Sequence, residues 1–149
     1  MRRPVVFAAF LAVVIGGGLL IGITIQPGAW HAALVKPPFN PPDWLFAPVW
    51  TTLYVMIAVA GARTFERGRG RGFALWCAQL VLNFAWTPVF FGLHQMGAGL
   101  VVIVALLAAI LAFIVDRWSA DRVSAWLFAP YAAWVAFATL LNASIVALN

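Results

Sequence analysis

The stretch KPPFNPPDWLFAPVWTTLY, residues 36–54, decides how this chain folds. Proline has no amide hydrogen and fixes its own φ angle, so residues 37–42, which include four prolines, cannot be helical. An apolar, aromatic-rich segment follows and favours a helix that begins near Asp43. The stretch therefore predicts a stiff aromatic loop that leads into a helix.

The rest of the chain is too apolar for a water-soluble domain. Of the 149 residues, 65% are hydrophobic and only 9% are charged. A domain of this length cannot bury so much apolar surface, so its solvent must be lipid. The net charge of +5 then indicates membrane topology rather than nucleic-acid binding.

Five apolar stretches are separated by the charged clusters of the chain. Each has roughly 18–26 residues, enough at ~1.5 Å per residue to cross a ~30 Å hydrocarbon core. Each must be a helix, because lipid offers no partner to backbone polar groups. We expect an all-α membrane protein with one domain over 1–149, a five-helix bundle in which the extramembrane loop 26–43 caps a pocket. The expected spans are about 5–25, 44–62, 73–93, 98–115 and 123–148.

The basic residues are distributed unevenly between the two sides of such a bundle. With five spans, the N-terminus and the loops after spans two and four share one side, which leaves only Lys36 of the nine basic residues on the other. Positive charge accumulates on the cytoplasmic side. We therefore predict a multi-pass bacterial membrane protein with a cytoplasmic N-terminus and an extracytoplasmic loop and C-terminus.

Polar and aromatic side chains gather in the half of the bundle beneath the loop. No ionisable residue lies in the middle of a span, which argues against ion-coupled transport. The helical spacing of aromatic and amide residues in three spans predicts an apolar ligand pocket with a few polar anchors. These residues are Phe46, Trp50 and Tyr54; Gln79, Asn83, Trp86 and Phe90; and Tyr131, Trp134, Ala138, Leu141 and Asn142.

Simpler interpretations exist for several of these features. Asn83 and Asn142 are also expected as interhelical hydrogen-bonding residues. Small residues at four-residue steps, in 8–16 and 74–78, allow close packing within the chain or in a homodimer. The sequence offers no metal-ligand set, nucleophile triad or phosphate-binding loop. Tryptophans near span ends are expected as interface anchors; these are Trp30, Trp44, Trp76, Trp118 and Trp126.

Four motifs carry a family resemblance that covers nearly the whole chain. With WHAALVKPPFNPPDW (30–44), APVWTTLY (47–54), AQLVLNFAWTPVFFG (78–92) and PYAAWVAFATLLN (130–142), the chain resembles the tryptophan-rich sensory protein family (TspO/MBR), also called translocator proteins or peripheral-type benzodiazepine receptors. The resemblance implies a commonly dimeric five-helix bundle that binds porphyrins such as protoporphyrin IX and requires no cofactor. Trp50 and Trp134 match two pocket tryptophans linked to light-dependent porphyrin breakdown.

The expected function is that of a membrane sensor or regulator that binds a porphyrin, protoporphyrin IX or a haem-like ring. The alternatives are a light-dependent porphyrin-degrading enzyme that uses Trp50 and Trp134, and a transporter of porphyrins or apolar metabolites. Expected partners are the porphyrin, membrane lipid and a second copy of the chain, without nucleic acid. The expected ligand-binding residues are Trp50, Trp134, Asn83, Trp86, Ala138, Leu141, Phe46, Tyr54, Phe90, His31 and Trp30.

Overall fold

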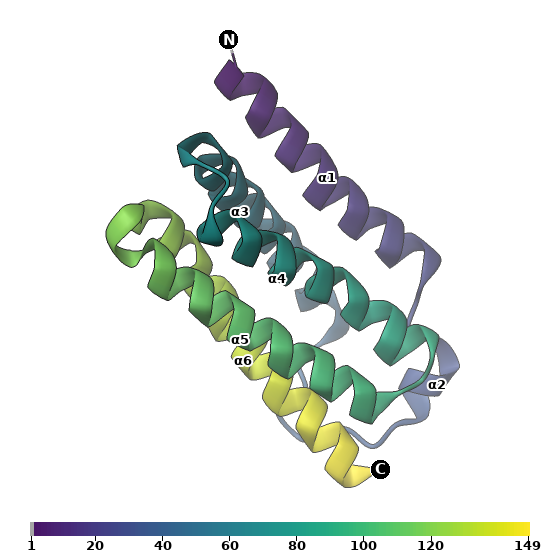
Figure 1. Ribbon diagram of the computed structural model, residues 1–149. Coiled ribbons are helices and arrows are strands. Elements are labelled where there is room, and N and C mark those ends of the chain that lie inside the picture. The colour runs from purple at the N-terminus through teal and green to yellow at the C-terminus, as the bar shows by residue number, and fades with distance from the viewer. Residues whose placement is uncertain (1) are drawn as a thin grey trace.

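The computed structural model describes residues 2–149, and over that range it consists of helices joined by turns and one long loop. Five of the helices are long and apolar enough to cross a membrane, which confirms the predicted all-α fold with five spans. They are α1 (Arg2–Thr24), α3 (Phe46–Arg67), α4 (Arg71–Thr87), α5 (Met96–Ala120) and α6 (Arg122–Leu148) (Figure 1).

Several helices run beyond the apolar stretches that predicted them. α3 continues to Arg67 and α5 to Ala120, although the apolar pattern stops near 62 and 115. Helical hydrogen bonds join backbone groups, so a helix does not end where its side chains become charged. α4 instead gives way to a π-helical turn, η2 (Pro88–Gly92), because Pro88 has no amide hydrogen to donate.

The loop before α3 has the structure that its prolines dictate. Residues 34–42 are not helical, as predicted, and a 3₁₀ turn, η1 (Asp43–Leu45), leads into α3. The first part of the loop holds a short helix, α2 (Gly28–Ala33), which the sequence analysis did not anticipate. Its GAWHAA segment contains no proline and can therefore form helical hydrogen bonds.

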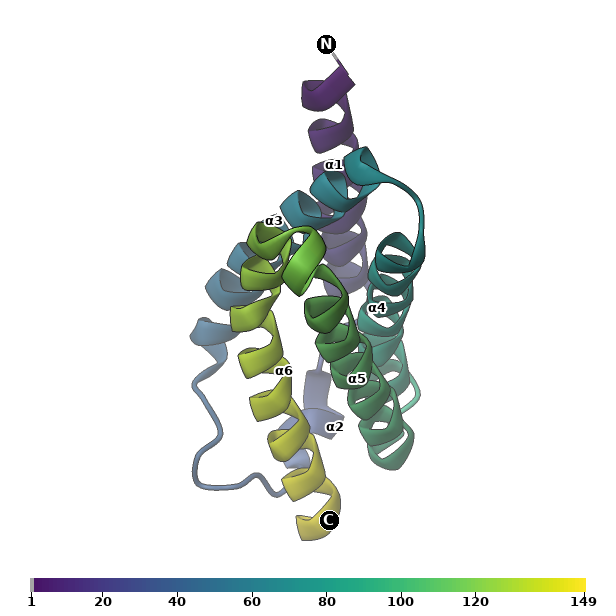
Figure 2. The same ribbon diagram turned by 60° about the vertical axis from the view of Figure 1, so that its left-hand side comes forward.

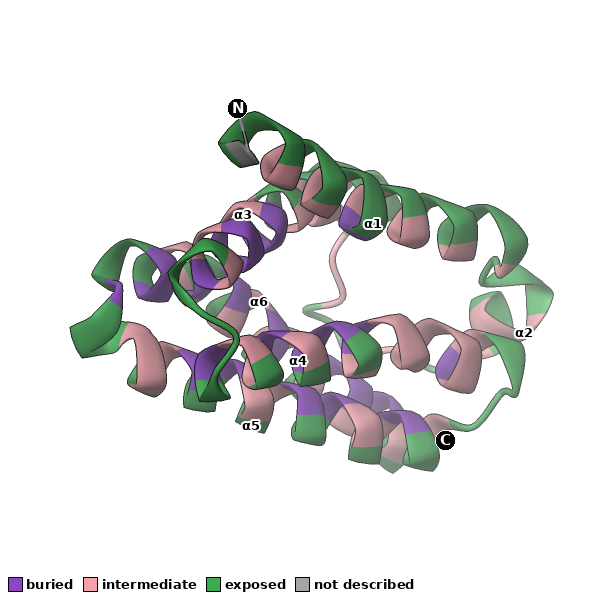
Figure 3. Ribbon diagram, turned by 45° about the horizontal axis from the view of Figure 1, so that its top comes forward, coloured by how far each residue is buried: buried purple, intermediate pink, exposed green. Residues whose placement is uncertain are grey.

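The order of the helices around the bundle differs from their order in the chain. α1 packs on α3, α3 on α6, α6 on α5 and α5 on α4. Buried residues concentrate on α3 to α6, whereas α1 is mostly exposed or half-buried (Figure 3). α2 and the C-terminus lie at one end, here called the lid end, and the α3–α4 and α5–α6 connections lie at the other (Figure 2).

The second end, here called the arginine end, is held by ion pairs between connections. Arg63 donates two hydrogen bonds to the Asp121 carboxylate, from Nε at 3.1 Å and from Nη2 at 2.8 Å. The Ser124 hydroxyl donates a third to the same group. Near it, Asp116 accepts hydrogen bonds from Arg71 and Arg117. The basic connections thus share one end; which side of the membrane this end faces stays a prediction.

Trp76 is not the interface anchor that its position near a span end predicted. Only 4% of it is exposed, and its Nε1 donates a 2.9 Å hydrogen bond to the Ile57 carbonyl across the α3–α4 contact. Its ring lies directly over Gly61, where a larger residue would collide with it. Distance from a span end does not reveal which face of the helix a side chain occupies. Trp44, Trp118 and Trp126 are exposed, as anchors require.

Replacing Gly61 with Val is expected to lower the stability of the protein by about 1–3 kcal/mol. The new side chain would displace the Trp76 ring and break its hydrogen bond to Ile57. Thermal unfolding in detergent, followed by circular dichroism, measures the change. Gly22→Val is the matched control, because a Cβ atom there meets nothing within 4 Å. Equal unfolding temperatures for the two variants would contradict the role of the contact.

The small-residue faces expected to support a homodimer are open in the single chain. Ala8 and Ala12 on α1 and Ala74 and Ala78 on α4 are all exposed. Such faces allow close approach by lipid or by another helix alike. The homodimer therefore stays a prediction.

Candidate ligand-binding site

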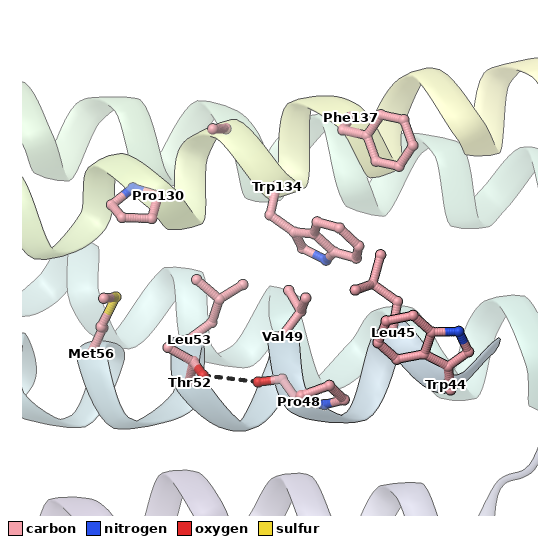
Figure 4. Close-up of a pocket in the computed structure, with 11 residues that line it drawn as sticks. Trp44, Leu45, Pro48, Val49, Thr52, Leu53, Met56, Pro130, Trp134 and Phe137 are labelled. Atoms are coloured by element: carbon pink, nitrogen blue, oxygen red, sulfur yellow. Dashed lines mark hydrogen bonds between the residues drawn. The ribbon is translucent and has the colours of Figure 1, made fainter. Parts of the chain in front are cut away.

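An apolar groove with a volume of about 700 Å³ lies between α3 and α6 (Figure 4). Small-molecule sites commonly have volumes of about 300–1,000 Å³, so the groove is large enough for a ligand. We call it the α3–α6 groove. It is lined by Trp44, Leu45, Pro48, Val49, Thr52, Leu53 and Met56 on the α3 side and by Pro130, Ala133, Trp134 and Phe137 on α6.

The groove forms where proline rings and other short side chains of α3 and α6 face each other. Pro48 lies in the first turn of α3, where a helix needs no amide donor, and the Thr52 hydroxyl donates to the Pro48 carbonyl at 2.9 Å. On α6, Pro130 and Ala133 leave room opposite these residues. Pro130 also leaves the Trp126 carbonyl without its helical donor. These short side chains thus leave part of the space between the two helices unfilled.

Trp134 is the residue that connects the groove with the predicted site. Its ring contacts Phe46 edge-on at 5.8 Å between centroids and Phe137 at 5.7 Å. Its indole Nε1 is buried and has no hydrogen-bond partner among the described residues. A buried donor left in this way costs about 1–3 kcal/mol.

Trp50 lies on the interior side of α3, at the depth of Trp134. Its spacing to Leu53 and Ile57 is three and then four residues, and both are buried, so Trp50 shares their face. Trp50 stands 13 positions before Arg63, and Trp134 stands 13 positions after Asp121, the partner of Arg63. At ~1.5 Å per residue, both lie ~20 Å from that ion pair.

Tyr54 lies on the interior side of α3, where α3 packs against α1. It packs against Trp50, with 5.6 Å between the ring centroids. Its ring lies over Gly18 of α1, where a Cβ atom would fall 2.5 Å from Tyr54 Cε2. Glycine at this position therefore allows α1 to approach the face of α3 that carries Trp50 and Tyr54.

Asn83 belongs to a buried hydrogen-bonded triad between α4 and α6. Its Nδ2 donates to the Tyr131 hydroxyl at 2.6 Å, and that hydroxyl donates to Gln79 Oε1 at 2.8 Å. The Gln79 Nε2 is buried without a partner among residues 2–149. Asn83 thus makes the interhelical bond that the sequence offered as its alternative role. The spacing of four between Gln79 and Asn83 was the signal for this triad.

Trp86 belongs to an aromatic cluster at the lid end. Its ring stacks on Phe90 at 5.0 Å, and its Nε1 donates a 3.1 Å hydrogen bond to Asn142 Oδ1. Asn142 in turn donates to the Met96 carbonyl, so it joins α4, α5 and α6. Leu141 packs in the same cluster. Both polar groups of this cluster are satisfied within the protein.

The loop is fastened above this cluster by contacts along its length. Trp30 stacks on His94 at 4.4 Å and meets Phe90 edge-on at 5.6 Å, and His31 meets Phe91 at 5.1 Å. Burial, reinforced by the Lys36 charge and opposed by Asp43, lowers the pKa of His31. These contacts hold the first half of the loop to the α4–α5 connection.

Two hydrogen-bonded groups fasten the next part of the loop. The Lys36 ammonium donates to the His31 carbonyl at 2.7 Å and to the Leu34 carbonyl at 3.3 Å. Asn149 accepts from the Val35 amide at 3.0 Å and donates to the Val35 carbonyl at 2.8 Å. The loop is thereby tied to the end of α6.

The eleven residues expected to bind ligand thus occupy neighbouring regions of the lid half. Trp134 lines the groove and touches Phe46; Trp50 and Tyr54 face inward from α3; Ala138 packs against the core. That all of them share one ligand cavity stays a prediction. Sequence reasoning missed most of the groove, whose signal was the run of residues four apart over η1 and α3: Trp44, Pro48, Thr52 and Met56.

The fold and the groove define a multi-pass helical membrane protein with an aromatic, ligand-sized apolar site. The chain belongs to the TspO/MBR family, whose model matches residues 8–148. It is similar to protein CrtK of Rhodobacter capsulatus, with 40% identity over 86% of this chain and 83% of the relative. It is also similar to a tryptophan-rich sensory protein of Cereibacter sphaeroides, with 36% identity over 96% and 90% of the two chains.

The similarity extends to an animal relative. The translocator protein of Homo sapiens is 38% identical over 76% of this chain and 70% of its own length.

Proposed function

We propose that this protein binds a porphyrin, such as protoporphyrin IX, in the lid half of the bundle and acts as a membrane sensor or regulator. The observation that carries the proposal is the α3–α6 groove beside Trp134, which combines ligand-sized volume with aromatic walls. A flat conjugated ring gains both apolar burial and stacking against indole and phenyl groups. Membership of a family that includes tryptophan-rich sensory proteins agrees with the sensory role.

We expect the porphyrin to contact residues on both sides of the Trp134 ring. The groove side offers Trp44 and Phe137, and the interior side offers Phe46 and Trp50. The indole Nε1 of Trp134 supplies a free donor. The porphyrin carboxylates would lie toward the lid end, where Lys36 carries the basic charge of the loop and keeps one ammonium hydrogen beyond the two carbonyls it already bonds.

Titration of the purified protein with protoporphyrin IX tests the proposal. Saturable quenching of tryptophan fluorescence, with one porphyrin per chain, is the expected result. The same titration in a protein denatured by sodium dodecyl sulfate supplies the control for nonspecific partitioning. Linear quenching without saturation in the folded protein would contradict porphyrin binding.

The same complex distinguishes a binding protein from a light-dependent enzyme. Trp50 and Trp134 lie at one depth, and Trp134 lines the groove, so photochemistry at these indoles is the second candidate. Illumination is expected to bleach the porphyrin absorbance faster in the wild type than in the Trp134→Phe variant if the protein degrades its ligand. Equal bleaching in both proteins leaves binding as the function.

A further inference from the structure

We propose that the apolar ligand reaches the site sideways from the lipid, through the α3–α6 groove, and not through the loop at the lid end. The proposal rests on the proposed function, because it concerns how the same ligand arrives.

The groove opens on the outer surface of the bundle. Its rim residues Trp44, Pro48, Thr52, Pro130 and Ala133 are exposed, although they belong to or adjoin the membrane-crossing helices α3 and α6. An exposed residue of such a helix faces hydrocarbon. The lining is apolar apart from the Thr52 hydroxyl, which its bond to Pro48 satisfies, and the indole N–H groups of Trp44 and Trp134. Hydrocarbon-soluble molecules therefore meet no polar barrier at this mouth.

The depth of the groove places its mouth within the hydrocarbon layer. Arg63 and Asp121 pair at the arginine end, which fits the level of lipid headgroups. Met56 lies seven positions before Arg63 and Leu45 lies 18 positions before it, so the groove extends from ~10 to ~27 Å above the ion pair. The hydrocarbon core is ~30 Å thick, so this interval lies almost wholly inside it, toward the lid-end leaflet.

The loop, in contrast, is attached to the bundle at several residues along its length. Asn149 holds Val35 through two hydrogen bonds, and Lys36 bonds two carbonyls of the same segment. Beyond Lys36 the prolines stiffen the chain, and Phe39 rests edge-on against Phe137 of α6 at 6.2 Å. Lifting the loop would break the bonds to Asn149 and the contact with Phe137, together with the ring contacts of Trp30 and His31. The sideways mouth requires no such change.

Trp134 stands between the groove and the interior face of α3. Its ring lines the groove and touches Phe46, which has the same helical face as Trp50. Since its Nε1 is bonded to no described residue, no hydrogen bond of the indole resists rotation of the ring. Rotation of the indole would open the groove toward Phe46, and the ring contacts with Phe46 and Phe137 are what a ligand moving toward Trp50 would have to displace.

Association kinetics in a defined membrane test the route. The protein is reconstituted into phosphatidylcholine–phosphatidylglycerol nanodiscs and mixed with vesicles of the same lipids that carry protoporphyrin IX. Quenching of tryptophan fluorescence gives the association rate. Ala133→Phe, which fills the groove from α6, is expected to slow association at least tenfold, and Thr52→Phe, which fills it from α3, provides an independent second variant. Because the groove is also the surface proposed to hold the porphyrin, the equilibrium affinity of each variant is measured beside its rate. Slower association with an affinity within about threefold of the wild type reports the route. A loss of affinity as large as the loss of rate would place the porphyrin in the groove itself and overturn passage past Trp134.

Two matched proteins serve as controls. Ala105→Phe places the same ring on an exposed site of α5, away from the groove, and is expected to associate at the wild-type rate. In a Cys77→Ser background, Val35→Cys and Asn149→Cys joined by a short bis-maleimide fix the loop to α6. This cross-linked protein is expected to associate within twofold of its uncross-linked form.

The outcomes separate the route from the function. Association at the wild-type rate in both Ala133→Phe and Thr52→Phe would overturn the route, and so would tenfold slowing on cross-linking the loop. In either case saturable binding by the wild type would leave the proposed function intact. Absence of saturable binding by the wild type would instead refute the proposed function itself.

Discussion

Trp134→Ala is expected to weaken protoporphyrin IX binding by at least about 30-fold, which corresponds to ~2 kcal/mol for a buried aromatic contact residue. The Trp134 indole lines the α3–α6 groove on one side and packs against Phe46 on the other. Its removal takes away stacking surface for the porphyrin and leaves a void beside the Phe46 ring. Fluorescence titration is unsuitable as the only measurement, because a tryptophan is removed. The shift of the porphyrin absorbance band on binding gives the dissociation constant independently.

Two further variants identify what Trp134 contributes. Trp126→Ala removes an exposed tryptophan two turns away on the same helix and is expected to bind porphyrin as the wild type does. Trp134→Phe keeps an aromatic ring and removes the unpartnered N–H, so its effect reports a hydrogen bond to the ligand, worth roughly 0.5–1.5 kcal/mol. Unchanged affinity in Trp134→Ala, with native circular dichroism, would exclude the groove as the porphyrin site.

Asp121→Ala is expected to lower the free energy of unfolding by about 3 kcal/mol, the lower part of the range for breaking a buried ion pair. The Asp121 side chain is only 2% exposed and accepts hydrogen bonds from Arg63 and Ser124. Its removal leaves the Arg63 charge and the buried Ser124 hydroxyl unpaired. Because 27% of Arg63 is exposed, water and headgroups offset part of the loss. Unfolding by sodium dodecyl sulfate in mixed micelles measures the change.

Arg71→Ala is the control for Asp121→Ala, because it breaks an ion pair at the same end. The Arg71 side chain is 82% exposed, so its bond to Asp116 is expected to contribute no more than about 1 kcal/mol. A loss of unfolding free energy in Arg71→Ala as large as that in Asp121→Ala would show that the exposure of an ion-paired side chain does not determine how much the pair stabilises this protein.

The stabilisation by Asp121 is also expected to depend on pH. Burial acts to raise the pKa of Asp121, but the hydrogen bonds from Arg63 and Ser124 and the charges of Arg63 and Arg67 prevail and lower it. A carboxyl whose pKa is lower in the folded protein stabilises the fold fully above its unfolded pKa of about 4, and this contribution is lost as the pH falls through the folded pKa. Asp121→Asn should therefore flatten the acid side of the stability profile. An unchanged acid slope would contradict this.

The sequence predicted the features that depend on local chemistry or on composition. Proline at 37, 38, 41 and 42 excludes a helix in any tertiary context, and the structure has none there. The five spans follow from the absence of water in the hydrocarbon layer. The spacing of Gln79 and Asn83 also placed both amides inside the bundle, since lipid offers no partner to an amide.

Other features depend on which helix face meets which neighbour. Trp76 has the sequence position of an interface anchor, yet it is buried because Gly61 on another helix leaves space for its ring. The bond between Asn83 and Tyr131 joins residues 48 positions apart, and no local pattern pairs them. Of the residues expected to bind ligand, only Trp134 lines the α3–α6 groove. The other lining residues are mostly small or aliphatic, and their four-residue spacing on α3 does not reveal which helix they face.

By itself, the sequence determined that this is a five-span helical membrane protein with a proline-stiffened loop and a family resemblance that the comparison of residues 8–148 bears out. Those properties follow from hydropathy, charge and backbone chemistry, which act over a few residues at a time. Only the tertiary structure decided that α6 packs beside α3 and that the loop is tied to Asn149. A groove between two helices is a space where side chains fail to meet, and that depends on the relative placement of segments about 80 residues apart.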